Sequence, residues 1–579
     1  MKPNSFLALV PRDAEAAAAA RRTVAPTGMG ERLTSDALLL FLPDCAPPPL
    51  SDGVGAVVGN LFDVSSTPVV TVDPHRFRHW RTTSGAALPD QYWGSYLALL
   101  PDNDGVTILR DPSGGVACYH VQTDLGLLLA SDAALIAATG LAALTIDWDE
   151  ILTQAVYVSL RTARTAVDPI CELLPGTAMR TNGVDIRVDC RWTPYSYAAG
   201  WTGDAGIDAA ADGLRRVVTN VVQAWARVYP QSLSELSGGL DSSIITACLA
   251  QTDGDVAGVT VRGRQADLDE TPYARMVADT CDIRLHCLTL DTAFIDLGRT
   301  ASAHLPRPTA RIFGQASDAQ IAALGRACGA QAFFSGGTGD TVLWYFNTAN
   351  PALDRLAVDG VAGFLRTISD LAEMCSVPHT RALTLAGRKL LQRRPQPWPY
   401  DRLFLAPDAC RSLPTNPPHP WWPAPRNTHR GVRAYVRALI QMQDHFEYYD
   451  RSEVAPLITP FYAQPVIEFC LGVPSWLWCA GGRNRAVARQ AFTDLLPPAI
   501  LERRTKGGFD GFANELLLER RGEAHARLRE GQMARAGLLD LAAIDATLAG
   551  ERPIAERSAN RLLRLLAIEA WLGCWASGG

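Results

Sequence analysis

Short runs of apolar residues, each closed by turn residues, fill the first part of the chain. Six of these runs predict strands, at 37–42, 53–62, 96–100, 105–109, 115–121 and 126–130. Several short strands at this spacing are typical of layered β proteins. We therefore expect a mostly antiparallel β domain over about the first 200 residues.

The pattern changes near residue 205, because helical periods now separate isolated strands. Strands are predicted at 233–236, 256–261, 285–290 and 331–334, and a helix with Thr271 as its cap and another at 316–328 lie between them. This alternation predicts a parallel sheet covered on both faces, with its ligand beyond the carboxyl ends of the strands. Residues 554–575 have apolar positions at helical spacing and predict a core helix.

One segment fits neither pattern. Residues 395–425 contain ten prolines together with Trp398, Trp421 and Trp422. Such a composition cannot form a regular helix or a central strand. Two interpretations stay open, a rigid loop that wraps the protein and a surface on which Trp421 and Trp422 contact the substrate.

Composition excludes several functional classes. Lys and Arg number 54 against 60 Asp and Glu, a net charge of -6 that provides no basic field for nucleic acid. The longest apolar runs are far shorter than the roughly 20 residues of a membrane span. The 13 cysteines form no Cys-x-x-Cys pair, which argues against a zinc ribbon or a disulfide framework. We expect a cytoplasmic protein that binds neither nucleic acid nor membrane.

The sharpest motif is Ser-Gly-Gly-Leu-Asp-Ser-Ser at 237–243, directly after a predicted strand and at the start of a helix. Glycines let the backbone approach a ligand closely, and a helix N-terminus favours an anion. The motif lacks the Gly-Lys-Ser/Thr ending of a Walker loop and is not a dinucleotide fingerprint. It predicts a pyrophosphate cradle formed by Ser237, Gly238, Gly239, Asp241, Ser242 and Ser243.

A second glycine-rich loop, Ser-Gly-Gly-Thr-Gly-Asp at 335–340, follows the fourth predicted strand. Both loops leave the same edge of a parallel sheet, so Ser335, Gly336 and Gly337 join the cradle and Asp340 faces Asp241 across the nucleotide. Two carboxylates among phosphates indicate a shared Mg²⁺.

With these motifs the chain resembles the asparagine synthetase superfamily, whose synthetase domain is an N-type ATP pyrophosphatase. Further matches follow the family order, at 59–62, 93–96, 110–114, 130–132, 174–176, 269–275, 450–451, 460–461 and 504–509. The resemblance implies a glutaminase-like domain at 1–204, an antiparallel β-sandwich of the Ntn type. It also implies a synthetase domain at 205–579 with a parallel sheet and C-terminal helices, interrupted by the insert 395–425.

The resemblance also implies ATP and Mg²⁺ as cofactors and assigns roles to single residues. The backbone of Gly258, Val259 and Thr260 would meet the adenine. Lys506 would neutralise the charge that grows on the phosphate and on the tetrahedral oxygen during catalysis. Glu270 is a candidate substrate-binding residue.

The N-terminus departs from the family. A working glutaminase of this type uses a cysteine as its first residue, whereas Met1 is here followed by Lys2. We therefore expect a vestigial glutaminase domain and no use of glutamine. An amine already present on the substrate would then attack the activated carboxylate.

Two amide-forming branches resemble this arrangement, the β-lactam synthetases and the lasso-peptide macrolactam synthetases. The β-lactam branch carries a Tyr where this chain has Gly337, and a Glu before the Pro-Phe pair. Residues 456–459 contain no carboxylate, and Glu453 is the nearest candidate. These departures favour a lasso-peptide cyclase that adenylates an Asp or Glu side chain of a core peptide and closes a macrolactam with its N-terminal amine. Expected partners are the core peptide, a leader peptidase and a leader-binding protein.

Other functions remain as alternatives. A β-lactam or other small-molecule amide synthetase would use the same cradle. A tRNA-modifying ATP pyrophosphatase would need a basic face or a sulfur-carrying cysteine pair. A catalytically silent binding scaffold would not need both intact glycine loops.

Overall fold

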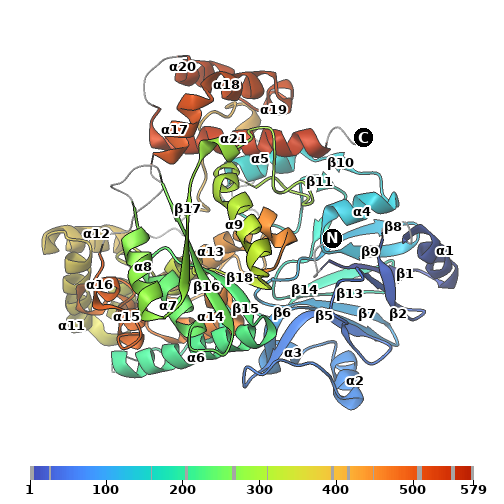
Figure 1. Cartoon of the computed structure of the whole chain (residues 1–579), viewed down its shortest axis with the longest axis horizontal. Helices are drawn as coiled ribbons and strands as arrows, with labels where there is room; N and C mark the ends of the chain where they lie inside the picture. The colour runs from blue at the N-terminus through green and yellow to red at the C-terminus, as the bar shows by residue number, and fades with distance from the viewer. Residues whose placement is uncertain are drawn as a thin grey trace.

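The chain forms a β-sandwich, a parallel sheet with flanking helices, a helical hairpin and a group of C-terminal helices (Figure 1). The structure is a computed structural model. It describes residues 5–24, 28–157, 159–202, 206–263, 269–309, 311–392, 397–411, 413, 418–447, 449–504, 511–549 and 554–575.

The first sheet of the sandwich has six antiparallel strands. Their order is β12 (Cys171–Glu172), β8 (Tyr119–Thr123), β9 (Gly126–Ala130), β1 (Leu7–Pro11), β3 (Leu39–Leu42) and β2 (Gly30–Thr34). The sequence pattern did not predict β1. This strand pairs on both sides and is buried on both faces, so it is a continuous apolar run without alternation.

The second sheet is also six-stranded and antiparallel. Its order is β14 (Ile186–Cys190), β13 (Thr177–Thr181), β7 (Gly105–Arg110), β6 (Tyr92–Asp102), β5 (Ala56–Asp63) and β4 (Leu50–Ser51). Its inner side chains, among them Val58 and Ile108, share one apolar cluster with Ala8 and Leu40 of the first sheet. The predicted antiparallel sandwich is confirmed.

Helices cover both outer faces of the sandwich. The first sheet packs against α1 (Ala14–Val24), α4 (Ala133–Thr139) and α5 (Trp148–Val156). Phe77 and Trp80 of α2 (Pro74–Thr82) pack on Val57 and Ala98 of the second sheet. The domain therefore has four layers, with a helical layer on each side of the two sheets.

The second domain is built on a five-stranded parallel sheet, which confirms the predicted arrangement and adds one strand. The order is β17 (Arg284–Thr289), β16 (Asp255–Arg262), β15 (Gln231–Glu235), β18 (Ala332–Phe334) and β19 (Leu457–Ile458). The short β19 comes from a distant part of the chain. The strand order reverses between β15 and β18, which is where such sheets open a ligand crevice.

Two helices show which faces of this sheet are covered. Leu233 of β15 packs with Ile321 of α9 (Gln315–Cys328). The next residue, Ser234, forms a 2.8 Å hydroxyl hydrogen bond with Thr246 of α7 (Leu240–Leu249). Successive residues of a strand point to opposite faces, so α7 and α9 lie on opposite sides. α8 (Thr271–Thr280) begins at Thr271, one residue after its N-cap Glu270.

The remaining helices complete the core. The predicted C-terminal helix is α21 (Glu556–Trp575), and α17 (Phe512–Glu519), α18 (Arg521–Glu530) and α19 (Gln532–Arg535) pack on it. α11 (Asn350–Met374) and α12 (His379–Leu391) form the hairpin.

The expected domain boundary at 204 and 205 falls outside the described residues, between η2 (Pro194–Tyr197) and α6 (Ile207–Val228). Among the described helices, none has the length and apolar character needed to cross a membrane.

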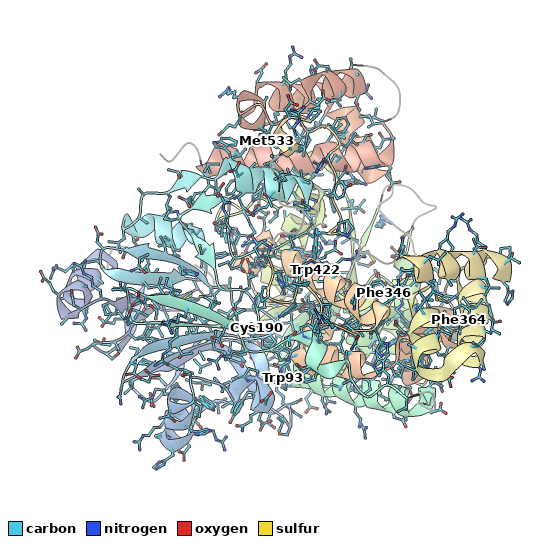
Figure 2. All side chains as sticks on the ribbon, turned by 180° about the vertical axis from the view of Figure 1, so that it is seen from behind. Trp93, Cys190, Phe346, Phe364, Trp422 and Met533 are labelled. Carbon is cyan, nitrogen blue, oxygen red and sulfur yellow. The ribbon has the colours of Figure 1, made fainter. Side chains whose placement is uncertain are left out.

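The Pro/Trp-rich segment packs against the N-terminal domain. Trp421 is 1% exposed, and its indole N–H donates to the Trp192 carbonyl over 3.2 Å. Trp422 lies near the centre of the molecule in Figure 2 and stacks edge-on against Trp398, with ring centroids 6.0 Å apart. Both tryptophans therefore contact other aromatic residues of the chain.

A buried ion cluster joins the two domains. Glu172 of the sandwich contacts Arg110 at 2.6 Å and Arg161 at 2.7 Å, and also pairs with Arg307 of the second domain. Arg161 contacts Glu447 of the second domain at 2.6 Å. Burial alone would raise the pKa of Glu447, but the neighbouring Arg161 and Arg110 hold it at about 2. The cluster needs both carboxylates ionised.

Replacing Glu172 by Gln should lower the free energy of unfolding by roughly 3–5 kcal/mol, because three buried arginines then lose a shared partner. The measurement is urea denaturation at neutral pH. Asp408→Asn, which removes an exposed pair with Arg411, is the matched control and should leave the midpoint unchanged. An equal, small effect of both changes would contradict the stabilising role of the cluster.

The same cluster predicts acid sensitivity. The folded-state pKa of Glu447 lies below its unfolded value of roughly 4.3, so its contribution is complete above that pH and is lost as the pH falls toward 2. In Glu447→Gln, the loss of stability over this interval should be smaller than in the wild type. Identical slopes of stability against pH would refute this.

Candidate active site

A cavity of about 360 Å³ opens at the switch point of the parallel sheet. It falls in the size range of small-molecule sites. Most of the predicted cradle residues line it, namely Ser237, Gly239, Asp241, Ser242, Val259, Thr260, Ser335, Gly336 and Gly337. The two sequence motifs therefore meet at one site.

The first glycine loop is shaped by close contacts. Gly238 has φ +70°, and a Cβ there would lie 2.5 Å from the Cβ of Tyr273, so only glycine fits. The hydroxyls of Ser237 and Ser242 lie 3.1 Å apart at the cavity. The Ser243 hydroxyl instead donates to the Gly239 carbonyl over 2.7 Å and secures the start of α7.

The second loop lies directly against the first. A Cβ at Gly336 would be 2.5 Å from the backbone nitrogen of Ser242, and a Cβ at Gly339 would be 2.5 Å from the side chain of Asp241. Glycine is required at both positions for this approach. The contact brings Asp340, in the short α10 (Gly339–Val342), beside Asp241.

Arg485 joins the two aspartates. Its Nη1 lies 2.9 and 2.7 Å from the two carboxylate oxygens of Asp241 and 2.7 Å from Oδ1 of Asp340. Its guanidinium also lies 4.8 Å from the ring centroid of Tyr345. Sequence reasoning missed Arg485, which precedes α15 (Ala486–Ala491) far from either loop. The cluster of Arg483, Arg485 and Arg489 is the signal that could have found it.

The two carboxylates fit a shared Mg²⁺. Both place an oxygen against the same nitrogen atom, so one cation can contact both. Mg²⁺ is commonly held by one or two carboxylates, with waters and substrate phosphates completing its oxygen shell. Within the described ranges, no group of three or more His, Cys, Asp or Glu residues could hold a metal alone. Asp241 and Asp340 would therefore share the ion with a nucleotide.

Two more arginines, Arg489 and Arg503, line the cavity. Arg503 donates to Glu270 over 2.7 Å and to the Gly238 carbonyl over 3.2 Å. Burial, followed by the nearby Arg485 and Arg483, lowers the pKa of Arg489 to about 10. Its guanidinium is held by Asn484 at 2.8 and 2.9 Å. Three arginines beside a helix N-terminus provide a strongly anion-binding wall.

The other residues predicted for the site do not all line the cavity. Glu270 accepts from Arg503, and a Cβ at Gly258 would meet Leu285 at 3.1 Å. Neither Glu270 nor Gly258 is among the described lining residues of the cavity. The Val259 carbonyl, expected near adenine, accepts from the Leu236 amide at 2.8 Å. Glu453, Trp421 and Trp422 are not among the described lining residues. Lys506 lies outside the described residues, so its role stays a prediction.

A second, smaller cavity of about 80 Å³ lies between the domains. Asn60, Gly94 and Ser95 of the sandwich and Tyr229 and Tyr462 of the second domain are among its lining residues, and the described lining contains no cysteine. Cys118 of the sandwich is fully buried, and burial raises the pKa of its thiol to about 12. A thiol of this kind is not a nucleophile at neutral pH.

Comparisons with known proteins identify one family. The model of the asparagine synthase family matches residues 214–573. No curated protein matches the chain.

Two solved structures resemble the chain weakly. One is the allosteric regulatory enzyme of purine biosynthesis, at 8% identity and a TM-score of 0.22, with 49% of this chain and 80% of that chain covered. The other is the glutamine phosphoribosylpyrophosphate amidotransferase of B. subtilis complexed with ADP and GMP, at 10% identity and a TM-score of 0.22. It covers 49% of this chain and 65% of that chain, just under two thirds. At these TM-scores neither likeness carries an argument.

Replacing Arg485 by Gln should make the protein respond to magnesium without nucleotide. Without the guanidinium, two neighbouring carboxylates repel each other, and a divalent cation relieves the repulsion. We expect MgCl₂ to raise the melting temperature over EDTA by about 2–4 °C more in the variant than in the wild type. Scanning calorimetry measures this, with the exposed Arg483→Gln as control. Equal magnesium responses in wild type and R485Q would exclude the shared cation site.

Proposed function

The chain belongs to the asparagine synthase family, and from this premise we propose that it is a lasso-peptide cyclase. The family consists of ligases that form amides with ATP and Mg²⁺. The proposal adds the substrate, a core peptide that supplies both the carboxylate and the amine. The observation that carries it is the meeting of two glycine loops and two aspartates at one cavity.

Activation of the carboxylate is the first step. The triphosphate binds at the first loop, where Ser237, Ser242 and the N-terminal amides of α7 donate hydrogen bonds. Arg485 and Arg503 offset its negative charge. Bound Mg²⁺ would add charge neutralisation there. The side-chain carboxylate of the peptide attacks the α-phosphorus, its new P–O bond replaces the bond to pyrophosphate, and an acyl-adenylate remains.

The nitrogen comes from the peptide itself. The described lining of the small interdomain cavity contains no cysteine, and its 80 Å³ is well below the size of ordinary ligand sites. The proposal therefore assigns the sandwich domain no release of ammonia from glutamine. The α-amine, with a pKa of roughly 8, attacks the acyl carbonyl, a C–N bond forms, and AMP leaves with the former carboxylate oxygen.

Gly337 supports a substrate that is larger than a single amino acid. It is exposed in the second loop, and of the described residues a Cβ there would meet only Ser335, whose hydroxyl lies at 3.2 Å, within 4 Å. Among the described residues, open space therefore lies beside Gly337, where the β-lactam branch carries a tyrosine. This space suits a substrate chain that continues out of the cavity. A leader peptidase and a leader-binding protein belong to the same proposal, as does charge neutralisation by Lys506.

Ring closure should depend on a free α-amine. The substrate is a synthetic core peptide with one Asp or Glu side chain, with and without N-terminal acetylation, and ATP is present in both reactions. The free peptide should lose the mass of one water, whereas the acetylated peptide should only support pyrophosphate exchange, since its nucleophile is gone. Mass spectrometry of the peptide and labelled pyrophosphate exchange measure the two steps.

Two outcomes would contradict the proposal. ATP-dependent loss of water from the acetylated peptide would show that the amine is not the nucleophile. Dehydration of a small amino acid, with no reaction of the core peptide, would favour a small-molecule amide synthetase.

A further inference from the structure

The second sheet of the sandwich ends in an exposed strand. Within the described chain β14 pairs with β13 and with no other strand, so it forms the edge of this sheet. All five of its residues are exposed, whereas β13 is almost entirely buried. Ile186 is 38% exposed and Val188 is 53% exposed. Apolar surface is therefore left open at this edge.

These apolar side chains continue the inner face of the sandwich. Val188 lies opposite Met179, which is fully buried in the core that the two sheets share. Directly paired residues of neighbouring strands place their side chains on the same face. The core surface therefore extends one strand further than the cover that the described chain provides.

One hydrogen bond fixes the pairing pattern along this edge. The Arg191 amide donates to the Gly176 carbonyl over 2.8 Å, one residue beyond the paired Cys190 and Thr177. Hydrogen-bonded and non-hydrogen-bonded pairs alternate along an antiparallel ladder. Cys190 and Thr177 therefore form a non-hydrogen-bonded pair, and the remaining pairs of β14 follow from the alternation.

The alternation shows which backbone groups of β14 point away from the sheet. The N–H and C=O groups of Arg187 and Asp189 point toward β13, and those of Ile186, Val188 and Cys190 point outward. No described residue forms a hydrogen bond with these outward groups. Cys190, labelled in Figure 2, ends the strand. Three residues thus present a free donor and a free acceptor each.

Nothing in the sequence of β14 blocks the addition of a further strand. Natural proteins usually protect an open edge with proline, lysine or a β-bulge. The strand reads Ile-Arg-Val-Asp-Cys and contains neither residue type, and its pairs with β13 run in continuous register. The edge is therefore a template for another strand.

The charges along the edge determine which strand fits it. Asp185, Arg187, Asp189 and Arg191 alternate in sign at every second residue. When two copies pair antiparallel about Val188, Arg187 of one copy lies opposite Asp189 of the other. Asp185 then lies opposite Arg191, so every carboxylate faces a guanidinium. Parallel pairing in register would instead place like charges side by side, which is unfavourable.

The backbone pattern agrees with the same pairing. Val188 of each copy would meet Val188 of the other, and Ile186 would meet Cys190, so only residues with outward groups form hydrogen-bonded pairs. Arg187 and Asp189 would then form non-hydrogen-bonded pairs, in which side chains lie closest. Asp189 already pairs with Arg191 of its own chain at 2.7 Å, and the second copy would add a further cation beside it.

We propose that β14 is a dimerisation edge, at which two copies of the chain pair antiparallel about Val188 and join their sheets. The open apolar surface of Ile186 and Val188 is then covered by the same residues of the other copy. A five-residue strand makes a small interface, so the dimer is reversible and dissociates on dilution. The inference is independent of the proposed function.

Sedimentation velocity of the full chain from about 1 to about 200 μM measures the dimer. Arg187→Asp and Asp189→Arg each turn two attractive pairs into repulsive ones, because the two-fold axis repeats the change. Each should raise the dissociation constant about tenfold or more. The double variant R187D/D189R restores opposite charges and should return the constant to within about threefold of wild type. Arg388→Asp, an exposed charge reversal on α12, is the control and should leave it unchanged.

Two further measurements locate the interface. Val188→Pro removes an outward N–H that β13 does not use, so it should abolish the dimer and leave the monomer folded. Hydrogen exchange resolved by residue should show the amides of Ile186, Val188 and Cys190 protected only at high protein concentration. The amides of Arg187 and Asp189, bonded to β13, should be protected at every concentration.

Four results overturn the proposal. The first is a chain that stays monomeric up to about 200 μM, which would leave the edge to a strand of another protein. The second is a dimer that persists unchanged in both single charge variants, and the third is a double variant that does not restore it. The fourth is a dimer whose outward amides stay unprotected. If V188P does not fold, the exposed charge variants still decide the question. None of these measurements uses ATP or peptide, so failure of the proposed function would not affect them.

Discussion

Parallel pairing of β15 with β18 determines where every functional group of the cavity lies. The register places Ser234 opposite Phe334, so the two strands end side by side and each continues directly into a glycine loop. Gly336 and Gly339 then allow the second loop to touch the backbone of Ser242 and the side chain of Asp241. A side chain at either glycine would separate the loops and, with them, the two aspartates.

Positive and negative side chains line different parts of the cavity. Arg485, Arg489 and Arg503 gather beside the loops, where a triphosphate would lie, and Arg485 balances two carboxylates until a nucleotide is present. Asp318 and Glu235 line the α9 side of the cavity, where Arg451 pairs with both. The unbalanced positive charge is therefore at the loops, and electrostatic preorganisation of this kind is a large part of catalysis.

The sandwich domain affects the cavity through one segment of the second domain. This segment takes part in the interdomain ion cluster and also lines the cavity. Glu447 is held in the interdomain ion cluster, and a few residues later Tyr449, Asp450 and Arg451 line the cavity. His445 of the same segment lies 2.8 Å from Arg311, another lining residue. The sandwich domain thus helps to fix one wall of the site through the ion cluster.

The parts of the site that are short continuous motifs could be predicted from the sequence. The contacts between residues far apart in the chain could not. The two loops were predictable because each is one short motif after one strand. The contacts of Arg485 with Asp241 and of Arg451 with Asp318 were not, since the partners lie over a hundred residues apart and only the fold brings them together. The strand β1 was missed because it is buried on both faces. The Pro/Trp-rich segment was predicted to be irregular, but its burial against Trp192 needed the structure.

The central claim is that a carboxylate attacks the α-phosphorus of ATP in this cavity. The most direct measurement uses a core peptide whose Asp or Glu side-chain carboxyl carries ¹⁸O, incubated with ATP and the protein, with the phosphate products analysed by mass spectrometry. We expect one ¹⁸O atom in AMP and none in pyrophosphate. Label in inorganic phosphate, with ADP as the other product, would contradict it.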